Sequence, residues 1–268
     1  MFGFTPEELE RYSRNILLSE VGGKGQKKLK EAKVLVVGAG GLGSPAAYYL
    51  AAAGIGKIGL VDSDAVDLSN LQRQILHRTE DVGKPKVESA REKLLALNPH
   101  IQVEVFNRRL DSGNVMDILS GYDLALDGVD NFSTRFLTND ACVIQKKPFF
   151  HGGVLRFFGQ AMTVIPGQGP CYRCVFRQPP PPGTAPTCAE AGVLGAIVGV
   201  IACIQATEVL KYILGAGELL TGRLMTFDGL AMSFETVQIR RDENCPVCGK
   251  QPTILQPQDE QEFVCQDK

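Results

Sequence analysis

Four residues near the amino terminus have the types and spacing of a phosphate- and ribose-binding site. Gly38, Gly40 and Gly43 form the pattern G-x-G-x-x-G, and Asp62 ends the apolar segment that follows. In this pattern the first glycine allows a tight turn, the second lets a phosphate approach the backbone, and the third lets a helix pack against a strand. An acid placed like Asp62 can bind both hydroxyls of a ribose. The spacing predicts nucleotide binding; its alternative is a tight structural turn.

Two basic residues, Arg73 and Lys86, lie in the polar, turn-rich segment after Asp62. That segment leaves the carboxyl end of a predicted strand, which is where ligands bind in open α/β sheets. Both side chains can there neutralise the charge of a triphosphate. The alternative role is solvation of the surface, but the position beside a nucleotide site favours a functional one.

Two acids, Asp127 and Asp130, follow a later apolar run. Acids at the carboxyl end of a strand that faces a phosphate site suit Mg²⁺, which prefers carboxylate, water and phosphate oxygens. Asp127 has an alternative role as the cap of a turn. Asp130 is therefore the stronger candidate for a magnesium ligand.

Two C-x-x-C pairs, Cys171 with Cys174 and Cys245 with Cys248, supply four thiolates for a tetrahedral zinc ion. The long separation between the pairs predicts a clamp between distant parts of the chain rather than a small finger. Four sulfur ligands leave no open catalytic position, which favours a structural zinc site over redox-active dithiols.

A further cysteine, Cys188, stands in a proline-rich loop directly before an apolar segment. A thiol near a helix N-terminus can have a lowered pKa and act as a nucleophile. The alternative is a cysteine without a chemical role, and the residues alone leave both open. Cys142 and Cys203 fall in apolar helical segments and are predicted to be packing residues. Cys265, in the polar tail, is assigned no role.

The periodicity of apolar residues predicts alternating strands and helices that bring these side chains to one edge of a sheet. Strands are predicted at residues 34–37, 58–61, 101–106, 122–126, 148–154 and 159–165, followed by antiparallel strands within residues 223–240. Helices are predicted at residues 7–20, 26–32, 42–53, 85–97 and 133–145, with a buried core helix at residues 191–207. The predicted fold class is α/β, a Rossmann-like parallel sheet continued by antiparallel strands, with a four-cysteine zinc site.

The amino-terminal helix has a strong start signal, because Thr5, Pro6 and Glu8 fit an N-cap, a first helical position and a capping box. Arg11 and Arg14 lie one turn apart in it, and the pattern alone favours a solvated face. We predict an N-terminal helical segment at residues 1–32, a single nucleotide-binding domain at residues 33–250, and a polar, mobile tail at residues 251–268.

The composition is that of an ordinary soluble globular protein, with 268 residues of which 44% are hydrophobic and 22% charged. The net charge of −2 gives no reason to expect nucleic acid or an anionic membrane as a partner. The charged amino terminus does not resemble a secretory signal, and the charge-free residues 191–207 are slightly short for a membrane span of about 20 residues. The eight cysteines therefore indicate metal or redox chemistry in a reducing cytoplasm.

Together these motifs resemble the MoeB/ThiF/HesA family, the bacterial relatives of ubiquitin-activating enzymes. The resemblance covers roughly residues 5–250, and its specific feature is the order of the motifs along the chain. The motifs are RYSRNILL, GAGGLG, DxDxVDLSNLQRQ, GKPKV, DGVDN, CYRC and CPVC. The family implies that the domain binds Mg-ATP and adenylates the C-terminal glycine of a ubiquitin-like sulfur carrier protein, with release of pyrophosphate. The product then becomes a thiocarboxylate for molybdopterin, thiamin or tRNA thiolation.

The resemblance also implies roles for individual residues. Arg14 reaches the active site of a partner subunit, which replaces the solvated-face interpretation and implies a homodimer. Cys188 matches a thiol on a mobile crossover loop, so we predict that it is reactive but not needed for adenylation. The implied catalytic residues are Arg73, Lys86, Asp130, Arg14 and Cys188. The implied ATP-binding residues are Gly38, Gly40, Gly41, Gly43, Asp62, Ser69, Asn70, Leu71, Gln72, Arg73, Gln74, Lys86, Asp130 and Asn131. The implied zinc ligands are Cys171, Cys174, Cys245 and Cys248.

The expected partner is a sulfur carrier protein that ends in Gly-Gly. A separate sulfur donor is also expected, because no rhodanese-like domain follows Cys248. An NAD-dependent oxidoreductase would share the glycine pattern and Asp62 but would not explain Arg73, Lys86 and Asp130. Two further candidates are a tRNA-modifying dehydratase, whose relatives commonly lack both C-x-x-C pairs, and a non-catalytic zinc scaffold that binds a ubiquitin-like protein.

Overall fold

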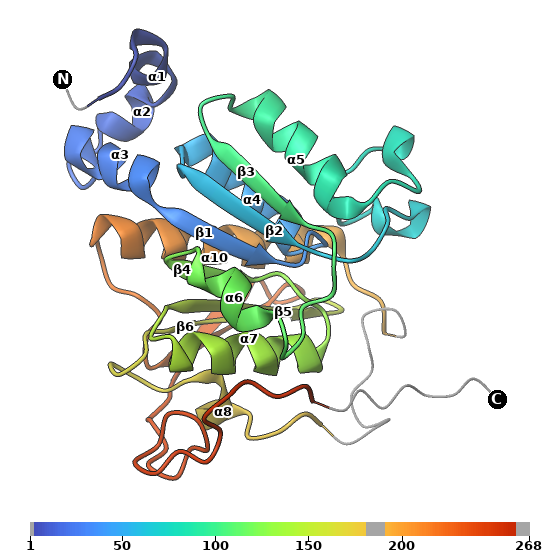
Figure 1. Ribbon diagram of the computed structural model, residues 1–268, viewed down its shortest axis with the longest axis vertical. Coiled ribbons are helices and arrows are strands. Elements are labelled where there is room, and N and C mark those ends of the chain that lie inside the picture. Colours follow the sequence, from blue (N-terminus) through green and yellow to red (C-terminus); the bar gives the residue numbers. More distant parts are fainter. Residues whose placement is uncertain (1–2, 181–190, 261–268) are drawn as a thin grey trace.

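The computed structural model describes residues 3–180 and 191–260, and its strands form one continuous eight-stranded sheet (Figure 1). The order across the sheet is β3-β2-β1-β4-β5-β6-β7-β8. The first five strands of the chain pair in parallel, and from β5 onward the pairing is antiparallel. The strands are β1 (Lys33–Val37), β2 (Lys57–Val61), β3 (Gln102–Phe106), β4 (Leu124–Asp127), β5 (Phe149–Leu155), β6 (Phe158–Val164), β7 (Arg223–Asp228) and β8 (Ser233–Gln238). The predicted fold class is confirmed.

The register of the three central strands gathers the predicted site at one edge of the sheet. Val37, the last residue of β1, pairs with Val61 at the end of β2 and with Asp127 at the end of β4. The glycine turn, Asp62 and the DGVDN segment therefore all begin from neighbouring strand ends. This is the edge at which ligands bind in open parallel sheets.

Helices cover both faces of the sheet, so the central strands are buried on both sides (Figure 1). Val34 and Val36 face one core, whereas Leu35 and Val37 face the other, as the two-residue period of a strand requires. The first face carries α3 (Gly22–Glu31), α4 (Gly43–Ala53), α5 (Lys86–Leu97) and α10 (Gly195–Leu214). The second face carries α6 (Val115–Ser120), α7 (Phe132–Ile144) and α8 (Tyr172–Val175).

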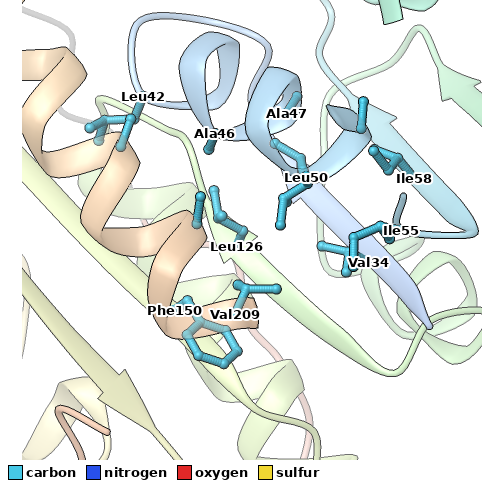
Figure 2. Packing of buried hydrophobic residues seen from close by; sticks show 14 of the residues in the cluster. Val34, Leu42, Ala46, Ala47, Leu50, Ile55, Ile58, Leu126, Phe150 and Val209 are labelled. Atoms are coloured by element: carbon cyan, nitrogen blue, oxygen red, sulfur yellow. The ribbon is translucent and has the colours of Figure 1, made fainter. Parts of the chain in front are cut away.

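The first core lies between α4, α10 and the sheet (Figure 2). Ala46 and Leu50 of α4 face this space together with Leu126 of β4, and Val209 of α10 lies beside Phe150 of β5. Small alanines on α4 let the two helices approach each other closely over the parallel strands. This packing fixes the start of α4, and with it the glycine turn.

The helix α10 is the one described helix that is long and apolar enough to cross a membrane by length and composition. Its polar residues instead take part in the core: Gln205 donates to the carbonyl oxygens of Asp127 (2.7 Å) and Phe150 (3.0 Å). Glu208 accepts a hydrogen bond from Thr163 at 2.7 Å. These contacts confirm the prediction of a core helix.

The start signal of the amino-terminal helix is confirmed, but its predicted length is wrong. Thr5 and Glu8 form the capping box, with the Thr5 amide 2.8 Å from the Glu8 carboxylate. Residues 7–20 do not form one helix, because α1 (Pro6–Arg11) ends at Tyr12 and α2 (Ser13–Ile16) begins after it. The hydroxyl of the buried Tyr12 accepts a hydrogen bond from Asn98 at 2.8 Å, and this tertiary contact overrides the helical periodicity.

The beginning of the carboxyl-terminal tail contacts the body of the protein at Asp259 and Glu260. The amide and the hydroxyl of Ser112 donate to the two carboxylate oxygens of Asp259 at 2.9 and 2.6 Å, and Ser133 donates to the Glu260 carbonyl at 3.1 Å. Arg173 donates to the Glu260 carboxylate at 2.5 Å. Residues 261–268, including Cys265, lie outside the described residues.

Candidate nucleotide site and four-cysteine cluster

The glycine turn is a place where three stretches of backbone meet. A methyl group added at Gly43 would lie 1.9 Å from the Gly38 carbonyl oxygen, and one added at Gly38 would lie 2.7 Å from the Gly128 carbonyl oxygen. Gly38 also has a φ of +91°, which other residues rarely adopt. The amides of Gly40 and Gly41 have no hydrogen-bond partner within residues 3–180 and 191–260. The turn therefore presents free N–H groups beside the first turn of α4, the arrangement that binds a phosphate.

Asp62 lies beside this turn, as the sequence predicts. Its two carboxylate oxygens accept hydrogen bonds from the amides of Ala39 and Asp64, each at 2.8 Å. Burial raises the pKa of Asp62, while the Lys86 ammonium and the two amides favour the ionised form. The carboxylate is thereby fixed at the end of β2, next to the place where a ribose would follow the phosphates.

The structure also brings Lys86 and Arg73 to the turn. Lys86 opens α5, is only 6% exposed, and donates to the carboxylate of Asp64 at 2.7 Å. Arg73 lies over the turn, since a methyl group added at Gly41 would be 3.6 Å from its Cδ. A methyl group added at Gly40 would be 3.5 Å from Nε2 of Gln74. Arg73 therefore lies beside Gly41, and Lys86 lies close enough to Asp62 to act on its charge.

The remaining residues of the SNLQ segment form the rim beside Arg73. Ser69 and Asn70 belong to the short helix η1 (Leu68–Asn70), which Asp67 caps by accepting from the Ser69 amide at 2.8 Å. Leu71 and Gln72 continue the turn. A methyl group added at Gly195 would lie 2.3 Å from the Gln72 carbonyl oxygen. The rim is thus held against the start of α10.

Asp127 is a buried structural acid and not a free metal ligand. Its Oδ2 accepts from Arg135 Nε and His151 Nδ1, both at 2.7 Å, and its Oδ1 accepts from the Val129 amide at 3.2 Å. Burial would raise the pKa of Asp127, but the charge of Arg135 and the bond from His151 hold it below its usual value. The predicted alternative, a turn cap, is confirmed for Asp127.

Asp130 follows on the same turn and is exposed. Its carboxylate has no hydrogen-bond or ion-pair partner in the described part of the chain. Gly128, two residues earlier, lies against Gly38, so the segment of Asp130 borders the glycine turn. Asn131 is engaged differently, because its Oδ1 caps α7 by accepting from the Thr134 amide at 2.8 Å. An unpaired carboxylate beside a phosphate-binding turn fits a magnesium ion.

The four predicted zinc ligands come together as one cluster. The sulfur atoms of Cys171, Cys174, Cys245 and Cys248 all lie within 4.8 Å of one another. The Cys171–Cys245 and Cys174–Cys248 sulfur distances are 3.5 and 3.4 Å. Thiolates about 2.3 Å from a tetrahedral zinc ion would be about 3.8 Å apart, so the cluster fits zinc with little adjustment.

The first cysteine pair is tied firmly to α7. Arg173 makes a bidentate ion pair with the buried carboxylate of Asp140, with distances between 2.7 and 3.0 Å. The Tyr172 amide donates to Asn139 at 2.9 Å, and its ring lies 4.8 Å from the ring of His151. The cluster is therefore connected, through Tyr172 and His151, to the acid that holds the DGVDN turn.

One predicted catalytic residue, Arg14, does not lie at the glycine turn. Arg14 is exposed on α2, which packs against the start of α3. Within α10, Val198 lies beside Gly41, and Leu214 lies beside Gly25 of α3. The part of the helix between these two residues is about 24 Å long. Arg14 thus lies near the opposite edge of the sheet from its own glycine turn. Cys188 lies outside the described residues.

Several buried polar residues at the site have no motif in the sequence, because their partners are distant in the chain. His77 donates or accepts at both ring nitrogens in the buried space under the glycine turn. From the sequence, Arg135 is predicted only to lie in a helix. The residues next to His151 and Gln205 in the chain predict no hydrogen bonds for either side chain. A polar residue within an apolar run is the one signal that could draw attention to His151 and Gln205.

Comparisons with known proteins identify the family of the chain. A profile described as the ThiF family matches residues 12–247. The chain is 51% identical over 243 residues to a Haloferax volcanii protein named SAMP-activating enzyme E1, covering 91% of this chain and 90% of that protein. It is 50% identical over 255 residues to the sulfur carrier protein adenylyltransferase of Thermus thermophilus, covering 93% and 94%. A crystal structure of E. coli MccB with ATP, 28% identical, superposes with a TM-score of 0.74 over 89% of this chain and 74% of that chain.

Proposed function

Because the chain belongs to the ThiF family, we propose that it binds ATP over the glycine turn and transfers AMP to the C-terminal glycine of a ubiquitin-like sulfur carrier protein. The class of reaction is that of the relatives, so the chain is an adenylyltransferase acting on a sulfur carrier protein. The proposal concerns the residues that carry this reaction. The observation that supports it best is the convergence of Gly40, Asp62, Arg73 and Lys86 at neighbouring strand ends.

In the proposed reaction a carrier carboxylate oxygen attacks the α-phosphorus of ATP. A new P–O bond forms, the bond to the β-phosphate oxygen breaks, and pyrophosphate leaves with the bonding electrons. No general base is needed, because the carboxylate is already ionised near neutral pH. Arg73 and Lys86 stabilise the negative charge that builds on the phosphates, and such fixed charges supply much of the catalysis in phosphoryl transfer.

We propose the remaining contacts to ATP from the same geometry. The free amides of Gly40 and Gly41 hold phosphate oxygens, and Asp62 holds the ribose. The Lys86 ammonium exchanges its partner Asp64 for a phosphate when ATP arrives. Asp130 would hold the magnesium ion that accompanies ATP, and that ion would neutralise phosphate charge. Asn131 leaves only its amide nitrogen for the ligand, because its oxygen caps α7.

We propose that zinc at the four-cysteine cluster is structural. The four sulfurs fill a tetrahedral shell, which leaves no position for a substrate. Zinc there would join α8 to the segment around Cys245 and so close the loop of chain that contains α10, β7 and β8. This role predicts that zinc affects folding before it affects catalysis.

The position of Arg14 supports a homodimer in which each subunit completes the site of the other. Arg14 is too far from its own glycine turn to reach it, as the length of α10 indicates. The neighbouring Leu17 and Leu18 are 72% and 54% exposed, as expected for side chains that a second copy covers.

The main test is carrier-dependent ATP–pyrophosphate exchange. The wild-type protein is expected to exchange label only in the presence of a carrier ending in Gly-Gly, and not with the same carrier lacking its last glycine. Arg73→Ala should lower exchange by about 10²-fold. NAD-linked hydride transfer, or binding of the carrier without exchange, would instead support the oxidoreductase or the non-catalytic scaffold.

Subunit complementation tests the role of Arg14. Arg14→Ala and Lys86→Ala homodimers are each expected to be nearly inactive. Unfolding and refolding them as an equal mixture should restore about a quarter of the wild-type activity, since half of the dimers carry one intact site. A mixture that stays inactive, or a mass of 29.0 kDa in solution, would contradict the shared site.

We propose that the chain works in the cytoplasm with a separate sulfur donor. Capture of small proteins from an extract, followed by mass spectrometry of thiocarboxylated Gly-Gly ends, identifies the carrier. The recovered carrier decides between molybdopterin, thiamin and tRNA thiolation.

A further inference from the structure

The peptide unit between Ala39 and Gly40, at the centre of the glycine turn, is held from inside the protein. The Ala39 carbonyl oxygen lies 2.9 Å from Nε2 of His77 and accepts a second hydrogen bond from Ser44 Oγ at 3.2 Å. The Ala39 amide is bound by Asp62 on the other side. His77 is 5% exposed and belongs to no predicted ligand set.

The hydrogen-bond partners of the two ring nitrogens of His77 determine which nitrogen carries the proton. Lys93 is paired with the buried Asp81, and its ammonium also donates to Ser89 Oγ at 3.3 Å. The Ala39 carbonyl oxygen can only accept a hydrogen bond, so Nε2 of His77 carries the ring proton and donates it to that oxygen. In the neutral ring Nδ1 is then an acceptor, and the Ser89 hydroxyl, 2.8 Å away, donates to it. Burial also lowers the pKa of His77, which keeps the ring neutral.

The carbonyl that His77 binds determines the direction of an amide in the site. In a trans peptide the C=O of one residue and the N–H of the next point to opposite sides. Holding the Ala39 carbonyl inward therefore turns the Gly40 N–H outward, toward the phosphate position. We propose that His77 is a positioning residue for adenylation: through Ala39, it aims the Gly40 amide at a phosphate of ATP.

A packing role alone would not require this arrangement. A side chain that only filled the space under the turn would place apolar atoms there. His77 instead makes a hydrogen bond with each ring nitrogen, one to Ser89 and one to the Ala39 carbonyl. Without His77 the Ala39 carbonyl would be left with the longer bond from Ser44. Because glycine allows almost any backbone angle at position 40, the peptide could then rotate and turn the carbonyl oxygen toward the phosphate. The inference rests on the proposed ATP site.

The test compares the binding of ATP and adenosine by calorimetry. His77→Leu is expected to weaken ATP binding about tenfold, the usual contribution of one hydrogen bond to a charged group. Adenosine, which has no phosphate, should bind within about twofold of wild type, because its ribose and base contacts are unchanged. His77→Gln keeps an N–H donor of similar reach and should restore most of the affinity. His100→Leu, far from the turn, is the matched control.

Nuclear magnetic resonance supplies a readout that a general loss of stability would not produce. In wild-type protein, ATP should shift the amide resonances of Gly40 and Gly41. In His77→Leu the shift of Gly40 should be lost while that of Gly41 remains. If His77→Leu does not fold, Ser89→Ala decides, because it frees the His77 tautomer and should weaken ATP binding about threefold.

Equal weakening of ATP and adenosine, or unchanged ATP binding in both His77→Leu and Ser89→Ala, would overturn the inference. These results differ from a failure of the proposed function. If wild-type protein bound no ATP, the nucleotide site itself would be refuted. If wild-type protein bound ATP and the variants bound it equally well, the role of His77 alone would be refuted.

Discussion

The glycine turn and the four-cysteine cluster use opposite methods to bring residues together. The turn draws most of its residues from one stretch of chain, positions 38–86, and leaves Asp130 and its amides open to a ligand. The cluster joins segments that lie far apart in sequence and closes its four sulfurs around one point. An open site must keep unpaired charge for its substrate, whereas a closed site has satisfied all of its ligands. Under the proposed function, the first arrangement serves reaction and the second serves stability.

A buried network connects the two regions. Tyr172, between the first two cysteines, packs on His151, and His151 donates to Asp127. Asp127 and Arg135 in turn hold the Val129 amide and carbonyl of the DGVDN turn. The closed region thus supports the segment that carries the exposed Asp130. The following experiments separate stability from reaction along this path.

The largest expected effect is the loss of the four-cysteine cluster. Cys245→Ser, or removal of zinc with a chelator, should cost about 5 kcal/mol or more of unfolding free energy, because structural zinc contributes its binding energy to folding. Chemical denaturation with zinc analysis measures this. Cys203→Ala, a half-buried cysteine outside the cluster, is the control. A Cys245→Ser protein of wild-type stability would refute a structural role.

Asp127→Asn should destabilise the protein by about 3–5 kcal/mol, because it leaves the buried Arg135 guanidinium without its carboxylate. Exchange activity should fall as well, since the DGVDN turn loses its anchor. Asp117→Asn, an exposed acid on α6, should change stability by less than about 0.5 kcal/mol. If the two variants had the same stability, the connecting network would not contribute to folding.

Asp130→Ala should act on reaction alone. We expect carrier-dependent ATP–pyrophosphate exchange to fall by about 10²–10³-fold, which is the usual cost of removing one electrostatic stabiliser. Zinc content and the denaturation midpoint should stay at their wild-type values. Unaltered exchange would refute the magnesium assignment, and a large loss of stability would show that the two regions are not separable at this residue.

Acidification should weaken both regions, since each contains one buried histidine. Burial lowers the pKa of both His77 and His151. In the unfolded chain the pKa of histidine is about 6.5. As the pH falls toward this value, protons bind the unfolded chain in preference to the folded one, and the unfolding free energy falls. Between pH 7.5 and 6.0 each histidine contributes a loss of up to about 0.8 kcal/mol. His151→Gln should flatten this slope by about half, and an unchanged slope would contradict its assignment as a neutral buried ring.

Cys188→Ala is expected to have the smallest effect. Adenylation needs no thiol nucleophile, so pyrophosphate release driven by the carrier should remain within about twofold of wild type. Later sulfur transfer is the step in which Cys188 should react, and alkylation with iodoacetamide measures its reactivity. Loss of pyrophosphate release in this variant would show that the prediction is wrong.

Much of the turn was predictable because its signals are local. The G-x-G-x-x-G spacing, Asp62 at a strand end and Lys86 at a helix start each depend on residues that are near one another in the chain. The two C-x-x-C pairs were predictable despite their separation, because together they supply the four thiolates of a tetrahedral zinc site. His77 and Arg135 were not, since their roles come from partners that only the packed sheet brings close. The break at Tyr12 was missed for the same reason, because its contact with Asn98 lies outside the helix.

The contact between Gly38, Gly43 and Gly128 has a consequence for the diversification of such proteins. Where three stretches of the main chain touch, a side chain added at any of these glycines would clash with backbone, so selection has no side chain to adjust at this place. New substrate preferences must then arise in the surrounding loops, whose residues can vary without disturbing the shared base. Proteins with this fold can therefore change the protein substrate that they bind while the glycine turn stays the same.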